Sequence, residues 1–119
     1  MKQIAASLIA ATALLAGCGL GLDGGDLIRA GAPTGQINVI NASSSTLTAI
    51  TVSPCDAFSH GFNRLPTGTQ LAPGQSYAFT VSAGCYDVQA GYGWGTGYAL
   101  ADFNNFYVPA GGARSLTIN

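Results

Sequence analysis

Asp56, Ser59 and His60 have the side-chain types of a hydrolytic triad and lie close together in one polar stretch. A serine nucleophile needs a base within hydrogen-bond reach and a third group that orients the base. The surrounding residues are rich in serine, glycine and proline, which predicts a surface loop, and no Gly-x-Ser-x-Gly elbow occurs. We therefore expect a loop without catalytic function, and a hydrolase that uses Asp56 and His60 is the least favoured alternative.

Other catalytic or metal-binding sets are incomplete. His60 is the only histidine, so nothing completes a zinc site, and no Asp-rich loop suited to calcium occurs. Asp56, Asp87 and Asp102 could supply the carboxylate pair of a glycosidase only if the fold placed two of them across a cleft, and no sequence feature brings any two together. We expect no metal and no cofactor.

The charges are few and scattered. The chain holds four basic and five acidic residues, and beyond Lys2 the cations are Arg29, Arg64 and Arg114. Nucleic-acid binding requires clustered Lys and Arg to neutralise phosphates, so nucleic acid is excluded as a partner. Asp87 could pair with Arg64 or Arg114, or face solvent.

Glycine occupies every second position from Gly91 to Gly97, with aromatic residues between. Alternate side chains of an extended chain share a face, so Tyr92, Trp94 and Tyr98 would line one side of this stretch. Two interpretations stay open. The aromatic rings fold back onto the edge of the domain, or they form an exposed platform for a sugar ring, a peptide or a protein, since aromatic patches are typical binding hot spots. Tyr92, Trp94 and Tyr98 are the candidate binding residues.

The N-terminus has the pattern of an export signal. Met1-Lys2 precedes an apolar run from Ile4 to Ala16, which is shorter than the ~20 residues of a membrane span and has the length of a secretory signal core. The run leads into Leu15-Ala16-Gly17-Cys18, which resembles the lipobox of bacterial lipoproteins. The resemblance implies export, cleavage before Cys18 and fatty acylation of Cys18, which would anchor the chain in a lipid bilayer. Because Gly19 follows the cysteine, the resemblance also implies the outer membrane, at its periplasmic face or at the cell surface.

With Cys18 assigned to lipid, Cys55 and Cys85 remain as an even pair in an oxidising compartment. We predict a disulfide between them, which would stabilise the fold by roughly 3–4 kcal/mol on the chain-entropy argument. Two free thiols or a metal-binding pair are the alternatives, and the metal pair lacks further ligands.

The rest of the sequence predicts a tether followed by short strands. Recurrent glycine predicts a flexible tether over residues 18–35, in which Leu27–Ala30 could form a brief turn or pack on the domain. The long connection over residues 54–75 is expected to be held by Cys55 and by inward-pointing apolar side chains, namely Phe58, Phe62, Leu65 and Leu71. Strands are expected over residues 36–41, 47–53, 76–81, 85–90, 98–103, 105–108 and 115–118, with one bent strand as the alternative to the pair around Asn104.

Four short motifs carry a further resemblance: Val39-Ile40-Asn41, Ile50-Thr51-Val52-Ser53-Pro54, Leu71-Ala72-Pro73-Gly74-Gln75-Ser76 and Gly84-Cys85-Tyr86-Asp87-Val88. They are similar to a small β-sandwich domain of bacterial exported proteins of unassigned function. We therefore expect an all-β fold, a small antiparallel β-sandwich of six or seven strands over residues 36–119, after a signal peptide over residues 1–17 and a tether over residues 18–35.

These expectations combine into a membrane-anchored bacterial lipoprotein with a structural or binding role in the cell envelope. Its partners would be the bilayer, through acylated Cys18, and an envelope protein or a glycan. No enzymatic activity is expected. The alternatives are an accessory subunit of a larger envelope assembly and, less favoured, an envelope hydrolase.

Overall fold

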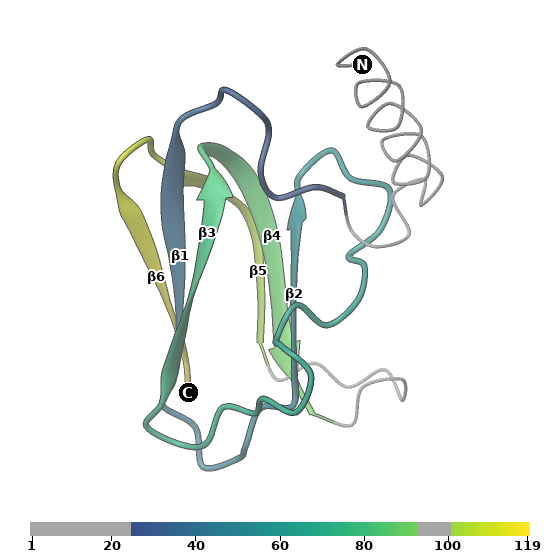
Figure 1. Ribbon diagram of the computed structural model, residues 1–119. Coiled ribbons are helices and arrows are strands. Elements are labelled where there is room, and N and C mark those ends of the chain that lie inside the picture. Colours follow the sequence, from purple (N-terminus) through teal and green to yellow (C-terminus); the bar gives the residue numbers. More distant parts are fainter. Residues whose placement is uncertain (1–24, 93–100) are drawn as a thin grey trace, which may run out of the picture.

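A computed structural model describes residues 25–92 and 101–119. These residues form six strands in two three-stranded sheets, of order β3-β1-β6 and β2-β4-β5, which face each other as two layers (Figure 1). The strands are β1 (Thr34–Asn41), β2 (Ala49–Pro54), β3 (Ser76–Ser82), β4 (Gly84–Gly91), β5 (Ala101–Val108) and β6 (Ala113–Ile118). The predicted all-β sandwich is confirmed, and the described residues contain no helix long and apolar enough to cross a bilayer.

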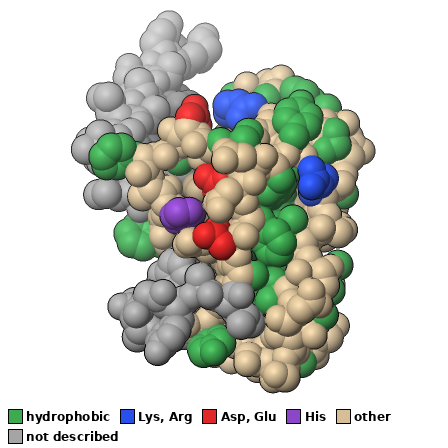
Figure 2. Space-filling view, turned by 180° about the vertical axis from the view of Figure 1, so that it is seen from behind, with side chains coloured by type: hydrophobic (Ala, Val, Ile, Leu, Met, Phe, Trp, Pro, Cys, Tyr) green, Lys and Arg blue, Asp and Glu red, His purple; other side chains and the backbone are tan. Residues whose placement is uncertain are grey.

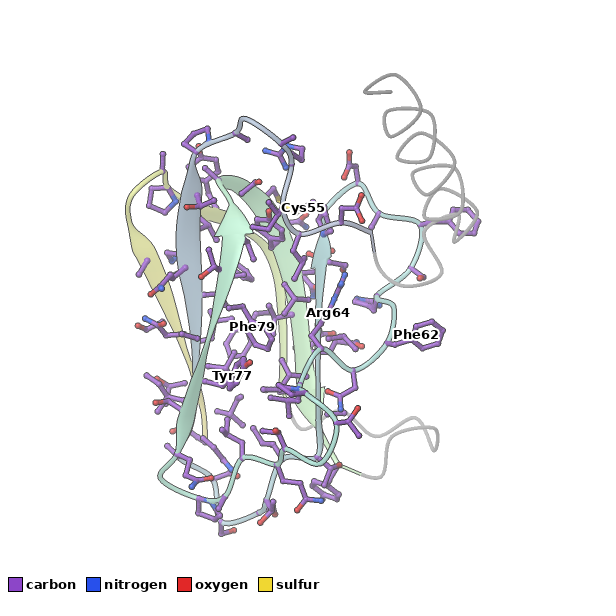
Figure 3. All side chains as sticks on the ribbon, viewed as in Figure 1. Cys55, Phe62, Arg64, Tyr77 and Phe79 are labelled. Atoms are coloured by element: carbon purple, nitrogen blue, oxygen red, sulfur yellow. A yellow bond between two sulfur atoms is a disulfide. The ribbon has the colours of Figure 1, made fainter. Side chains whose placement is uncertain are left out.

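The core lies between the two sheets because alternate side chains of each strand point inward. Ile37 and Val39 from β1 belong to the same core cluster as Tyr86 and Val88 from β4, and all four are fully buried. Figure 3 shows Phe79 of β3 pointing into the same interior. In each of these pairs the two buried residues are two positions apart, as the period of a strand requires.

One pair of neighbouring strands is parallel, whereas an antiparallel arrangement was expected. β1 runs parallel to β6, with Ile37 opposite Arg114 and Asn41 opposite Ile118. Parallel neighbours require a long connection between them, and here that connection contains all four other strands. The last strand can therefore add to the free side of the first.

The two strands expected around Asn104 are one strand with a bulge. Tyr86 pairs with Phe106, and Val88 pairs with Phe103, so Asp87 alone faces two residues of β5. One of the two, Asn105, has a φ of 56°, in the left-handed region that asparagine tolerates better than most residues. The Oδ1 atom of Asp87 accepts a 2.8 Å hydrogen bond from the Asn105 amide and holds the bulge in place.

The described part of the expected tether, residues 25–33, lies against the sandwich. Leu27 packs on the core, and its carbonyl accepts a 2.7 Å hydrogen bond from the Ser82 amide. The Arg29 amide donates a 2.7 Å hydrogen bond to the Ser82 hydroxyl. An apolar side chain and these backbone contacts fix the segment, and β1 already begins at Thr34.

Candidate functional site

A disulfide joins Cys55 to Cys85, with their Cα atoms 5.4 Å apart, and so confirms the predicted pairing. The two cysteines continue the register of β2 and β4, since Pro54 pairs with Tyr86 and the Cys55 amide donates a 3.0 Å hydrogen bond to the Cys85 carbonyl. The bond closes a loop that contains the whole connection between β2 and β3.

That connection runs along the edge of β2 and is fastened by polar contacts. The Arg64 amide donates a 2.7 Å hydrogen bond to the Ile50 carbonyl, and Oδ1 of Asn63 accepts one of 2.9 Å from the Ile50 amide. Nε of Arg64 donates a 3.0 Å hydrogen bond to the Val52 carbonyl. An exposed strand edge would invite pairing with another chain, and these contacts cover this edge.

The same contacts explain why the apolar residues of the connection divide into two groups. Leu65 and Leu71 are buried, as expected, whereas Phe58 is 86% exposed and Phe62 is 65% exposed, so the expectation was wrong for both phenylalanines. Polar contacts by Asn63 and Arg64 hold the chain, and its phenylalanine rings remain on the outside. Figure 3 shows Phe62 pointing away from the strands.

A small hollow of about 120 Å³ contains the residue types of the Asp56, Ser59 and His60 cluster in a different combination. We call it the His60 hollow, and it is lined by Ser53, Ala57, Phe58, Ser59, His60 and Asp87. Asp56, the acidic residue of the cluster, is exposed and does not line it. Figure 2 shows acidic side chains on either side of the histidine on this face.

Within the part of the chain that the structure describes, no hydrogen bond joins His60 to Ser53 or to Asp87 in the His60 hollow. A nucleophile requires such a contact with its base, so these two side chains are not arranged as a nucleophile and an orienting acid for His60. The Asp87 carboxylate is already used by the Asn105 amide. Among residues 25–92 and 101–119, no three His, Cys, Asp or Glu side chains are grouped so that they could hold a metal ion.

Arg64 and Arg114, the two arginines suggested by the sequence as partners of Asp87, donate to backbone carbonyls instead. Nη2 of Arg64 donates to the Gly25 carbonyl, and Nη1 of Arg114 donates to the Tyr107 carbonyl. Both guanidinium groups bind backbone oxygens and so stabilise the fold.

A larger open hollow of about 530 Å³ lies beside the start of β2. We call it the neutral hollow, because the described residues that line it are all uncharged: Thr48, Phe62, Asn63 and the run from Leu65 to Gln70. The Thr48 amide donates a 2.9 Å hydrogen bond to the carbonyl of Gly91, the residue before Tyr92. The glycine-alternating stretch that starts at Gly91 therefore begins next to Thr48, which lines this hollow.

The predicted binding residues can be placed only in part. Tyr92 is 42% exposed at the end of β4, while Trp94, Tyr98 and the predicted lipidation site Cys18 lie outside the described residues. Comparison with models of protein families, with curated proteins and with solved structures finds no match to this chain.

Proposed function

We propose that this chain is a lipid-anchored bacterial envelope protein whose β-sandwich has a binding role and no catalytic one. The anchor rests on the lipobox-like Leu15-Ala16-Gly17-Cys18 sequence. The disulfide between Cys55 and Cys85 supports export, which the anchor requires, because disulfides persist in oxidising compartments such as the bacterial periplasm.

The observation that carries the binding role is the neutral hollow, whose lining residue Thr48 is hydrogen-bonded to Gly91, the residue before Tyr92. Its lining offers hydroxyl and amide groups from Thr48, Asn63 and their neighbours, with no charged side chain among them. Phe62 in its wall and exposed Tyr92 nearby add aromatic surface. Neutral hydrogen-bonding groups next to aromatic rings suit a sugar ring, so an envelope glycan is the favoured ligand class.

The anchor is tested by fractionating cells that produce the wild-type chain or Cys18→Ser. The wild type should be found with membranes and carry acyl mass, and the variant should be soluble. A variant that remains in the membrane fraction would refute acylation as the means of attachment.

The binding role is tested by placing a photo-crosslinking residue at Tyr92 or at Thr67 in the neutral hollow, with exposed Thr80 on β3 as the control position. Glycan adducts at Tyr92 and Thr67 but not at Thr80 would support glycan binding. A single reproducible protein adduct would favour the assembly-subunit alternative, and no adduct at either position would overturn the proposal. The hydrolase alternative instead requires an activity that His60→Ala abolishes without changing the melting temperature.

A further inference from the structure

Gly25, the first described residue, lies beside two residues of the connection between β2 and β3. A Cβ built on Gly25 would lie 3.7 Å from the Cβ of Ala57, and Nη2 of Arg64 donates a 2.6 Å hydrogen bond to the Gly25 carbonyl. Ala57 precedes Phe58, and Arg64 follows Phe62 after one residue. The two exposed phenylalanines therefore lie within two residues, along the chain, of the side chains beside Gly25.

Only residues 19–24 separate Gly25 from Cys18. A fully extended chain rises at most ~3.6 Å per residue, so Gly25 can lie no more than about 25 Å from Cys18. An acylated Cys18 would keep this edge of the domain close to the bilayer surface, and the 55–64 part of the connection with it.

Phe58 and Phe62 are the most exposed large apolar side chains among residues 25–92 and 101–119, at 86% and 65%. Figure 2 shows hydrophobic side chains standing out at the edge of the molecule on the histidine's side. Phenylalanine is among the residues that enter the headgroup boundary of a bilayer. From their place beside Gly25, we infer that Phe58 and Phe62 dock into the surface of the membrane that holds Cys18.

The charges at this edge define which lipid surface fits. Asp26 and Asp56 are exposed and adjoin Gly25 and Ala57, whereas the nearest cation, Arg64, is half-buried and bound to two carbonyl oxygens. Exposed carboxylates are repelled by anionic headgroups, and the exposed Arg29, three residues from Asp26, can balance only one of these two carboxylates. The docking surface therefore suits zwitterionic phospholipid and disfavours anionic lipid.

This inference rests on the proposed acyl anchor, and it adds orientation to it. Two or three acyl chains already hold a protein firmly, so the phenylalanines contribute little to attachment. They instead fix which edge of the sandwich faces the membrane. Because Phe62 also lines the neutral hollow, docking brings one rim of that hollow to the headgroup layer.

The test uses the acylated full-length chain in phosphatidylcholine vesicles, with a photo-crosslinking residue at position 58, 62 or 107. Tyr107 is the control, because it is an aromatic residue that is 58% exposed and lies on β5, at the opposite edge of its sheet from β2 and the connection that runs along β2. Phospholipid adducts should form several-fold more at 58 and 62 than at 107. Phe62→Ser should lower the yield at position 58, Tyr107→Ser should not, and adding phosphatidylglycerol should lower the yield at both phenylalanine positions.

Equal yields at the three positions, or none at 58 and 62, would overturn the docking inference. Acylation is read separately, from the intact mass of the chain isolated from membranes. A chain without acyl mass would remove both the anchor and the docking, whereas an acylated chain that fails to label at 58 and 62 would leave the anchor standing and overturn docking alone.

Discussion

Nη2 of Arg64 donates a 2.6 Å hydrogen bond to the Gly25 carbonyl, while Nε of the same side chain donates one of 3.0 Å to the Val52 carbonyl. One guanidinium group thus joins the N-terminal segment, the long connection and the edge of β2. No carboxylate is involved, so the contact is between a charged donor and neutral backbone oxygens, a pairing that is stronger than a neutral hydrogen bond.

We expect Arg64→Met to lower the free energy of unfolding by about 1–3 kcal/mol, because two backbone carbonyls lose a charged donor. Hydrogen exchange around Gly25 should also become faster in the variant. Arg114→Met is the matched control: this exposed arginine donates one 3.1 Å bond and lies 5.6 Å from the Phe106 ring centroid, so its loss should cost less than about 1 kcal/mol. Urea unfolding of the three proteins gives the comparison, and equal losses would contradict the role given to Arg64.

The disulfide should account for a large part of the stability of so small a domain. Replacing both cysteines, as Cys55→Ala with Cys85→Ala, is expected to lower the free energy of unfolding by roughly 3–4 kcal/mol. Reductant should lower the melting temperature of the wild type and leave that of the double variant unchanged. A wild type that reductant does not affect would show that the bond contributes nothing to folding.

The predicted disulfide is sufficient to derive the register of β2 and β4. If Cys55 and Cys85 are opposite each other on antiparallel strands, counting outward pairs Ser53 with Asp87 and Val52 with Val88, which is the observed register of β2 and β4. That register also brings Asp87 into the His60 hollow, a placement that spacing along the chain does not suggest.

Two features could not be predicted from local pattern. The sequence of β2 does not show which of its faces points to the core, because the structure buries all its residues from Ala49 to Ser53. The exposure of Phe58 and Phe62 depends on polar contacts by Asn63 and Arg64, which form only after β2 is in place. Hydrophobicity alone favours burial of both rings.

Gly35 is a position where any side chain should be costly. An added Cβ would overlap the Pro109 carbonyl oxygen and lie 2.7 Å from Cγ1 of Val108. Gly35→Ala should therefore lower the free energy of unfolding by about 1–3 kcal/mol, the usual cost of overpacking. Gly68→Asn is the control, since Gly68 has a φ of +83° in open space, a conformation that asparagine tolerates. Chemical denaturation should show Gly35→Ala as the more damaging change, and the reverse order would refute the close approach at Gly35.

The last prediction concerns alkaline pH and the fully buried Tyr86. Its hydroxyl donates a hydrogen bond to the Ser82 carbonyl and lies 3.4 Å from the Leu27 carbonyl. Burial raises the pKa of Tyr86 above its usual value of 10.0, and nearby Arg29 opposes this shift only in part.

Because the folded state favours the neutral phenol, Tyr86 contributes stability that is fully present below about pH 10, where unfolded tyrosine ionises, and that is lost as pH rises through the folded pKa. The free energy of unfolding should fall as the pH rises above about 10 in the wild type and in the control Tyr107→Phe, and much less in Tyr86→Phe. The chain contains one lysine, Lys2, and four tyrosines besides Tyr86, so the comparison with Tyr86→Phe isolates the contribution of Tyr86. Urea titrations at several pH values measure the slopes, and an equally steep fall in Tyr86→Phe would show that another group causes the alkaline loss.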